Sequence, residues 1–215
     1  MKIVAFSDTH GLHNFSEIPD GDMLIFAGDM CAGGTDHDIQ VFDYWMGNLP
    51  HKHKIVIAGN HDKPLEKGKR HLINNAIYLQ DEEVVIEGIK FYGSPWQPEF
   101  NNWSFNLPKN GMELKEKWDM IPDDTDILIT HGPPIYILDR NGEGEVCGCN
   151  LLLERVKQVN PSYHLFGHIH EGYGRAVVGQ TTFLNCSVCN GDYVPCNAPH
   201  QFEFEKLEPQ ERWPL

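Results

Sequence analysis

The sequence predicts an α/β fold whose strands carry polar residues at their carboxyl ends. Two observations support this prediction. Strands and helices alternate over the first part of the chain, and the later part is rich in strand-like segments. In addition, five short runs of β-branched and aromatic residues read as buried strands. These runs are KIVAFS, MLIFA, KIVIA, DILIT and YHLF. Ligands gather where strand ends meet in open α/β sheets, so the five runs should deliver one polar cluster.

The first part of the chain resembles a βαβ unit. Strands are predicted near residues 2–7, 23–27 and 54–58, with an amphipathic helix between the last two. The apolar residues at helical spacing in that helix are Ile39, Phe42, Trp45 and Met46. Residues 84–93 alternate about Glu87-Gly88, which predicts a hairpin and the start of a second sheet.

The second half is expected to continue with helices and strands after one long loop. Residues 93–111 are rich in Pro, Asn and aromatic side chains, and such a long loop is often functional. The predicted helices lie near residues 112–120 and 149–159. The predicted strands lie near residues 126–130, 163–166, 173–178, 181–186 and 201–206. The segment 207–215 is expected to pack on the domain or on a partner.

Length and charge favour one domain that acts on a small substrate. With 215 residues, the chain is read as a single domain, 1–215. Its formal net charge of −14 argues against long nucleic acid as a partner, because nucleic-acid-binding domains usually carry a basic surface. The sequence shows no signal-peptide pattern and no apolar run of membrane-spanning length, so no membrane partner and a cytoplasmic location are expected.

Six cysteines allow three interpretations. Cys147 and Cys149, with Cys186 and Cys189, are candidates for a four-thiolate zinc site, although structural zinc pairs usually come as two C-x-x-C units. Disulfides are a second reading. We expect reduced, buried thiols, since cytosolic cysteines are kept reduced.

The residues that follow the five runs are of types that bind metal. Asp8 and His10 are two apart at a strand end, so their side chains project to the same side. His168 and His170 repeat that spacing. Taken singly, the Asp8-His10 pair is weak evidence, because Asp8 could simply cap a helix, whereas the His168-His170 pair is moderately specific for a metal site. Asp29 taken singly suggests an ordinary Gly-Asp turn, but a carboxylate can also bridge two cations.

The remaining two runs end in Asn60-His61 and His131. Adjacent residues in an extended chain point to opposite sides, so we assign the Asn60 carbonyl oxygen to a metal and leave His61 to face the substrate. His131 alone would more often be a structural histidine. As a set, Asp8, His10, Asp29, Asn60, His131, His168 and His170 are too many ligands for one ion.

Two divalent ions bridged by Asp29 account for this set of ligands. Such pairs lie about 3.5 to 4 Å apart and stabilise in-line displacement at phosphorus, so hydrolysis of a phosphate ester is the predicted reaction. Nitrogen and oxygen ligands suit manganese, the metal we predict, and also iron, zinc, cobalt or nickel.

Together, the motifs resemble the five-motif signature of the calcineurin-like metallophosphoesterases over residues 8–170. The runs SPW-x-P-x-FNNWSFNLP, TDILITHGPP and GHIHEGYG are similar to the metallophosphoesterase-domain, brain-type subgroup, which is read as phosphodiesterase-like. The resemblance implies a four-layer α/β/β/α sandwich of two mixed sheets. It also implies one metal held by Asp8, His10, Asp29 and His170 and a second held by Asp29, Asn60, His131 and His168.

The resemblance further implies that His61 is catalytic and stabilises or protonates the leaving oxygen. The protein phosphatases of this superfamily follow Gly-Asp with an Asp-Arg-Gly tract, whereas Gly28-Asp29 is followed here by MCAGG. The missing arginine disfavours a phosphomonoester substrate. Arg140 and Arg175 are possible substitutes, although a solvent-exposed role is the plainer reading for each.

The expected substrate is therefore a small phosphodiester of the cyclic nucleotide kind. Trp96 and Trp103, with Phe100 and Phe105, could stack a base, or could simply pack the loop. A phosphomonoesterase or pyrophosphatase, a nuclease and a non-catalytic scaffold remain alternatives. The sequence leaves the oligomeric state open.

Overall fold

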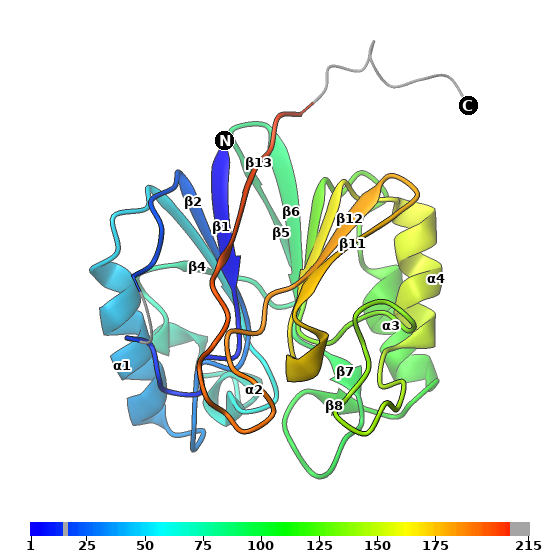
Figure 1. Cartoon of the computed structure of the whole chain (residues 1–215), viewed down its shortest axis with the longest axis horizontal. Helices are drawn as coiled ribbons and strands as arrows, with labels where there is room; N and C mark the ends of the chain where they lie inside the picture. Colours follow the sequence, from blue (N-terminus) through cyan, green and yellow to red (C-terminus); the bar gives the residue numbers. More distant parts are fainter. Residues whose placement is uncertain (15–16, 207–215) are drawn as a thin grey trace.

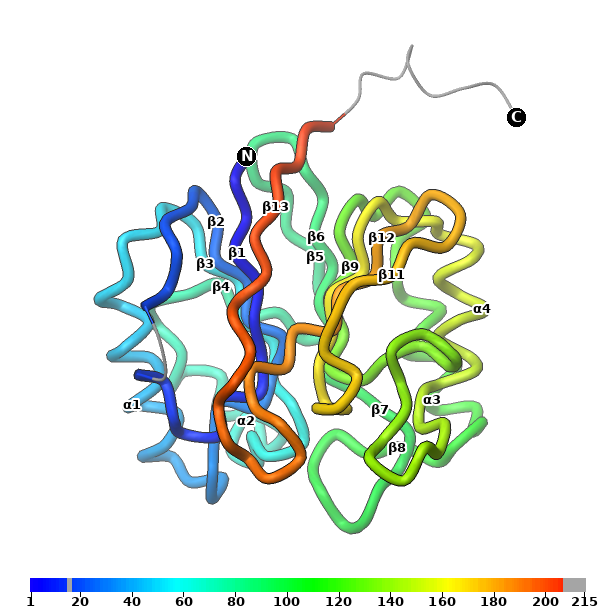
Figure 2. Tube along the Cα trace, in the orientation of Figure 1, coloured from blue at the N-terminus to red at the C-terminus, as the bar shows by residue number. Residues whose placement is uncertain are grey.

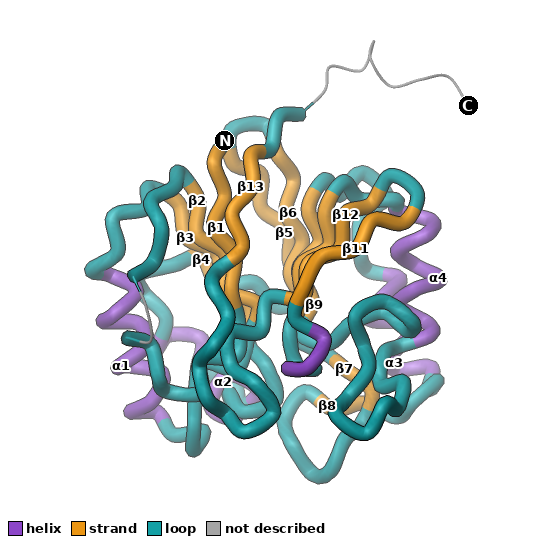
Figure 3. Tube along the Cα trace, viewed as in Figure 1, coloured by secondary structure: helices purple, strands orange, loops and turns teal. Residues whose placement is uncertain are grey.

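Two β-sheets packed face to face form the centre of the fold, and helices cover their outer faces (Figure 1). A computed structural model describes residues 1–14 and 17–206 of the chain. The prediction for residues 207–215 lies outside this part. The layer order of helix, sheet, sheet and helix confirms the predicted four-layer sandwich (Figure 3).

The first sheet has five strands in the order β13-β1-β2-β3-β4. Their bounds are β1 Lys2–Phe6, β2 Met23–Ala27, β3 His53–Ile57, β4 Ile77–Tyr78 and β13 His200–Glu203. Strands β1 to β4 are parallel, and β13 pairs antiparallel with β1, so the two ends of the described chain lie side by side (Figure 2).

The second sheet has six strands in the order β11-β12-β10-β9-β6-β5. Their bounds are β5 Glu82–Ile86, β6 Ile89–Ser94, β9 Ile127–Thr130, β10 Tyr163–Phe166, β11 Gly174–Val178 and β12 Thr181–Asn185. The central four strands are parallel, and the edge strands β5 and β11 are antiparallel. Glu87 and Gly88 both have positive φ, 50° and 81°, which suits the tight β5–β6 turn.

Residues 1–14 and 17–206 also contain four α-helices and two 3₁₀ turns. They are α1 Asp36–Gly47, α2 Lys63–Glu66, α3 Met112–Asp119, α4 Asn150–Val159, η1 Arg70–Leu72 and η2 His170–Gly172. A capping box fixes the start of α1: the Thr35 side chain accepts from the Asp38 backbone N–H, and the Asp38 side chain accepts from that of Thr35. Within the described residues, none of the helices has the length and apolar character needed to cross a bilayer.

Alternation along the strands separates two apolar layers. In β1, Val4 and Phe6 face α1, whereas Ile3 and Ala5 face the second sheet. A third layer packs α3 and α4 on the outer face of the second sheet. The parallel strands end at one edge of the sandwich, and this arrangement positions the polar residues that follow them.

The structure differs from the sequence prediction in three local features. The loop 93–111 contains a small two-stranded sheet, β7 Gln97–Pro98 and β8 Asn106–Leu107. The short strand β4 and the short helix α2 were not expected, because neither is long enough to show a hydrophobic period. The six cysteines are free thiols, four of them buried, but Cys147 is only half-buried and Cys196 is exposed.

Candidate metal centre

The polar residues that follow the five parallel strands meet at the carboxyl edge of both sheets. Asp8 follows β1, Asp29 follows β2, Asn60 follows β3, His131 follows β9 and His168 follows β10. Asp29, Asn60 and His168 line a cavity of about 550 Å³, while Asp8 and His131 are fully buried and contact lining residues. The cavity wall includes His10, Asp29, Asn60, His61, His168 and His170. The structure thus brings together every metal-ligating residue predicted from the sequence.

The chain bends sharply to place these side chains. Asp8, His10, Asp29 and His168 all have φ between 46° and 69°, a left-handed conformation that non-glycine residues rarely adopt. Such backbone strain clusters at functional sites, where the surrounding structure enforces it.

Gly59 is required because the ligands approach its backbone closely. A Cβ on Gly59 would lie 2.6 Å from the Asp29 backbone nitrogen and 2.6 Å from His131 Cε1, and it would also clash with Asp29 Oδ1. The loop before Asn60 can therefore fit against Asp29 and His131 only with glycine at this position.

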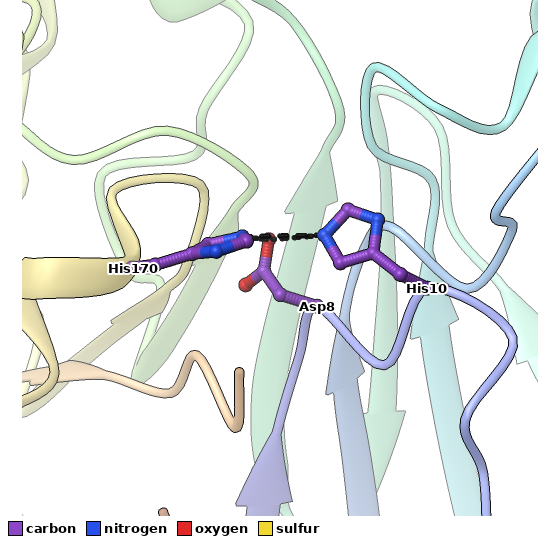
Figure 4. Close-up of side chains that lie close together, drawn as sticks. All are labelled: Asp8, His10 and His170. Atoms are coloured by element: carbon purple, nitrogen blue, oxygen red, sulfur yellow. Dashed lines mark hydrogen bonds and ion pairs between the residues drawn. The ribbon is translucent and has the colours of Figure 1, made fainter. Parts of the chain in front are cut away.

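Asp8, His10 and His170 form the first ligand group (Figure 4). His10 Nε2 lies 3.2 Å from His170 Nε2 and 4.0 Å from Asp8 Oδ1. His170 Nε2 lies 3.5 Å from the same Asp8 oxygen. All three side chains are buried, and their nitrogen and oxygen atoms converge on one point.

Asp29, Asn60 and His131 form the second ligand group. His131 Nε2 lies 3.0 Å from Asn60 Oδ1 and 3.4 Å from Asp29 Oδ2. Asp29 Oδ2 also lies 3.8 Å from His10 Nε2 in the first group. Asp29 therefore stands between the two groups. The His168 ring packs beside that of His131, with 5.1 Å between ring centroids.

Backbone carbonyls fix the tautomers of two histidines. His131 Nδ1 lies 2.9 Å from the Ala27 carbonyl, and His170 Nδ1 lies 2.8 Å from the Asn190 carbonyl. A carbonyl oxygen only accepts, so each Nδ1 carries the hydrogen and donates it. In the neutral ring the Nε2 lone pair then points into the ligand group, which is the arrangement found in metal-ligating histidines.

Charge in the cluster shifts the pKa of several groups. Burial opposes ionisation of Asp29, but His131, His10 and His61 together hold the pKa of this carboxyl well below its usual range. Burial likewise opposes protonation of His131, but Asp29, Asp8 and the Ala27 carbonyl together raise its pKa to about 9. Burial, as the largest cause, takes the pKa of His168 down to about 3. The neighbouring carboxylates therefore favour the protonated form of His131.

The donor set fits divalent metal ions. With Nδ1 of His170 protonated, its Nε2 lone pair faces His10 Nε2 at 3.2 Å, and the buried His10 Nδ1 has no partner among the described residues. A cation between the two rings would be held by the Nε2 atom of each ring. Imidazole, carboxylate and amide oxygen together suit manganese, iron, zinc, cobalt or nickel.

Asp62 holds the two metal-facing loops together. Its carboxylate accepts hydrogen bonds from the backbone N–H groups of Asp29 at 3.0 Å, Gly59 at 2.8 Å and Cys31 at 3.0 Å. Burial, and then repulsion by Asp29, raises the pKa of Asp62 to about 6. Sequence reasoning gave Asp62 no role, although it follows directly on Asn60-His61.

Ser187 supports Asp8 and was not predicted. Its hydroxyl donates to Asp8 Oδ2 at 2.8 Å, Ser7 Oγ donates to the same oxygen, and the His168 backbone N–H reaches Asp8 Oδ1 at 3.2 Å. Asn190, whose carbonyl orients His170, lies in the same segment after β12. In the sequence, Ser187 and Asn190 are marked only by their position in a polar segment that follows a predicted strand.

His61 lies beside the cluster with its ring clamped in place. Its Nδ1 lies 3.2 Å from the Ala32 carbonyl, and its ring stacks on Trp103 at a centroid distance of 4.2 Å and an interplanar angle of 22°. The His10 ring meets it edge-on at 4.5 Å. The Asn60 side chain faces His131, whereas the His61 ring faces Trp103 and His10, and a His61 nitrogen lies within 4.8 Å of ligand atoms of His10 and Asp29.

The two tryptophans predicted to contact substrate have different positions. Trp103 lines the cavity. Trp96 does not: its indole N–H donates to Asp81 at 2.8 Å and its ring packs on Phe105. The prediction for Trp96 is therefore corrected to a packing role, because its polar atom is already satisfied away from the cavity.

Neither arginine proposed as a substitute phosphate ligand lines the cavity. Arg140 donates to the Gly144 carbonyl at 2.7 Å, and Arg175 lies on the edge strand β11. Among the described residues that line the cavity, Lys109 is the one lysine or arginine.

Comparisons with known proteins agree with this geometry. The sequence pattern of the family described as calcineurin-like phosphoesterase matches residues 1–172. Metallophosphoesterase domain-containing protein 1 of Homo sapiens is 42% identical over 226 residues, which cover 92% of this chain and 69% of that protein. One solved crystal structure superposes with a TM-score of 0.66 at 18% identity, over 86% of this chain and 89% of its own. The crystal structure of TT1561 of Thermus thermophilus superposes with a TM-score of 0.57 at 16% identity, over 86% of this chain and 88% of that chain. These two structures support the fold.

Proposed function

This chain belongs to the calcineurin-like phosphoesterase family, and we propose that it is a dinuclear-metal phosphodiesterase acting on small phosphodiesters. The observation that supports this proposal most is the position of Asp29. Its carboxylate lies between two groups of buried ligands, one with His10 and one with His131. Two ions that share one carboxylate would stand close enough to act on one phosphoryl group.

The proposed ligand assignment follows the two groups. Asp8, His10, Asp29 and His170 would hold one ion, and Asp29, Asn60, His131 and His168 would hold the other. When bound, the two ions would neutralise phosphoryl oxygens and lower the pKa of a water molecule. Manganese is the metal we propose, with iron, zinc, cobalt and nickel as alternatives of the same ligand chemistry.

His61 is proposed as the general acid. Its Nδ1 donates to the Ala32 carbonyl, which leaves Nε2 as the atom that can face a leaving oxygen. As a water oxygen bonds to phosphorus and loses a proton to solvent, the P–O bond to the leaving alcohol would break, and the imidazolium form of His61, with hydrogens on both nitrogens, would pass its Nε2 proton to the leaving oxygen. Stacking on Trp103 holds the imidazole in this position.

The charge of the cavity supports a diester rather than a monoester. A dianionic phosphomonoester needs cationic side chains beside the metals, and the described cavity wall supplies only Lys109. The formal net charge of −14 also disfavours long nucleic acid as a substrate. The cytoplasm is the location that we propose, to be tested by fractionation.

The test is hydrolysis of bis-p-nitrophenyl phosphate beside p-nitrophenyl phosphate, with protein stripped of metal and then reloaded with manganese. We expect faster cleavage of the diester and loss of both activities on stripping. A faster monoester reaction would favour the phosphomonoesterase or pyrophosphatase alternative. No turnover with any divalent metal would favour a non-catalytic scaffold.

A further inference from the structure

Two aromatic side chains in the cavity wall are left open. Phe100, in the loop between β7 and β8, is 55% exposed, and Tyr193, in the loop after β12, is 49% exposed. Among residues 1–14 and 17–206, they are the two large hydrophobic side chains that are exposed and also line the cavity. Both loops lie at the edge of the sandwich where the parallel strands end (Figure 2). Aromatic side chains around a few polar groups in a concave site are typical of ligand binding.

The two rings lie beside different ligand groups. The Tyr193 ring contacts two residues of the first group edge to face: its centroid lies 4.7 Å from that of His10, at 78°, and 5.3 Å from that of His170, at 81°. The Phe100 centroid lies 6.1 Å from that of His168, at 80°. His168 in turn packs beside His131 of the second group. Each ligand group therefore has one open aromatic ring next to it.

The turn that carries Tyr193 is held by hydrogen bonds. Asn190 Oδ1 accepts from the backbone N–H groups of Asp192 and Val194, both at 3.0 Å. The Asn190 carbonyl accepts from the Tyr193 backbone N–H at 2.9 Å and also from His170 Nδ1 at 2.8 Å. Tyr193 has a φ of 60°, which is uncommon for a large side chain. The shared carbonyl thus fixes the Tyr193 turn relative to His170, and backbone strain enforced at such a position is a sign of function.

The tryptophans and the second phenylalanine of the 93–111 loop already have partners. Trp103 is half-buried, stacks on His61 at 4.2 Å and has Lys63 Nζ 5.0 Å from its ring centroid. Phe105 is fully buried and packs on Trp96. Phe100 and Tyr193 therefore offer a substrate the most open aromatic surface in this cavity.

A phosphodiester carries two organic groups on one phosphorus atom, and the tetrahedral phosphorus sends them in different directions. We propose that Phe100 and Tyr193 are substrate-binding residues, and that each ring packs on a planar aromatic group of the phosphodiester. This inference rests on the proposed phosphodiesterase function. It favours a linear diester with a planar group on each alcohol over a cyclic diester with one such group. A phosphomonoester, with one organic group, would use only one of the two rings.

Calorimetry on the manganese-loaded protein tests the ring contacts without hydrolysis. The probes are dimethylphosphinate, methylphenylphosphinate and diphenylphosphinate, which are monoanions like a diester but have no ester bond. Each phenyl that replaces a methyl group should tighten binding about tenfold, a factor within the range that stacking on one aromatic side chain contributes.

Single variants assign each contact. Phe100→Ala and Tyr193→Ala should each lower the diphenyl-to-dimethyl affinity ratio about tenfold, and the double variant should combine the two losses. Tyr193→Phe keeps the ring and should keep the wild-type ratio. Tyr136→Ala is the matched control and should also keep it, because Tyr136 is 72% exposed and has a φ of 67° but does not line the cavity.

Three results would overturn the proposal. A wild-type ratio in either alanine variant would show that its ring does not contact the aromatic group. Loss of the ratio in Tyr193→Phe would assign the contact to the hydroxyl group. Weaker binding of manganese by either alanine variant, measured by titration, would make the ring a support of the ligand histidines instead.

Hydrolysis separates this inference from the proposed function. With bis-p-nitrophenyl phosphate, both alanine variants should raise KM and leave kcat near the wild-type value, because binding that is equal in ground state and transition state acts on KM. If the wild type cleaves the diester and the variants bind the phosphinates as it does, the proposed function stands and the ring proposal fails. If the wild type cleaves no diester, the proposed function fails, and the calorimetric ratios still decide whether the two rings bind aromatic groups.

Discussion

Replacing Gly59 by alanine tests whether close packing aligns the two ligand groups. The new Cβ would lie 2.6 Å from both the Asp29 backbone nitrogen and His131 Cε1, whereas ordinary contact begins at 3.4 Å. The difference, 3.4 − 2.6 = 0.8 Å, is the displacement that Asp29 or His131 must undergo. Both are buried and hydrogen-bonded, so neither can move away freely.

A shift of this size exceeds the tolerance of a preorganised site. Ligand geometry has to hold within roughly 0.5 Å, and loss of ligand orientation typically costs about 10- to 100-fold in metal affinity. Overpacking should also lower the free energy of unfolding by about 1 to 3 kcal/mol, which lowers Tm by roughly 2 to 12 °C for a chain of this size.

Isothermal titration of metal-stripped protein with Mn²⁺ and calorimetric melting measure the two effects on Gly59→Ala. Gly33→Ala is the control, since Gly33 lies in an open loop where the nearest atom to a new Cβ is Asp38 Oδ2 at 3.6 Å. Wild-type manganese affinity together with a wild-type Tm for Gly59→Ala would refute the argument that this close approach positions the ligands.

Three further predictions concern single side chains. His61→Asn should lower kcat for the diester by about 10²- to 10⁴-fold while two Mn²⁺ ions still bind by titration, and loss of metal binding instead would reassign His61 as a ligand. Ser187→Ala removes the 2.8 Å hydrogen bond to Asp8, so it should cost about 1 kcal/mol of stability and weaken manganese binding, with an unaltered titration contradicting that role. Burial lowers the pKa of His164 from 6.5 to about 3, so between these pH values the unfolded chain binds a proton that the folded chain does not, and stability falls as pH falls. At pH 5 the loss of stability is about 2 kcal/mol. Urea unfolding at pH 7 and at pH 5 should therefore show a smaller difference in the free energy of unfolding for His164→Phe than for the wild type. Equal differences for the two proteins would exclude this histidine as the cause.

The strands and the ligand set were predictable because each depends on local pattern. A run such as KIVAFS marks a buried strand, and Asp8 and His10 follow it within a few residues. Parallel strands then bring such residues to the carboxyl edge of the sheet, independently of the length and conformation of the loops that connect the strands. The sequence therefore predicted that Asp8 and His170, which are far apart in the chain, would meet, and the structure places them 3.5 Å apart.

The supporting residues could not be predicted because their roles depend on packing between distant segments. Ser187 reaches Asp8 only because the Ser7 and Ser187 segments run side by side as an isolated parallel bridge. The two tryptophans of the 93–111 loop look equivalent in sequence. The hydrogen bond to Asp81 and the packing on Phe105 hold the half-buried Trp96 away from the cavity, whereas Trp103 lies on His61.

The ligand groups also join the two sheets. Asp8 and His10 follow a strand of the first sheet, whereas His170 follows a strand of the second, and Asp29 meets His131 across the same boundary. At this boundary the pKa of the Asp29 carboxyl is lowered and the pKa of His131 is raised, because each favours the charged form of the other. Ions that bind only when both sheets are in place would add their binding free energy to the packing of the sheets, about 2.7 kcal/mol for each site at a metal concentration 100 times its Kd. The ligands that would bring two cations to a phosphoryl group would therefore also hold the two sheets together. The binding free energy of the ions would offset the cost of the left-handed backbone that the ligands adopt at this edge.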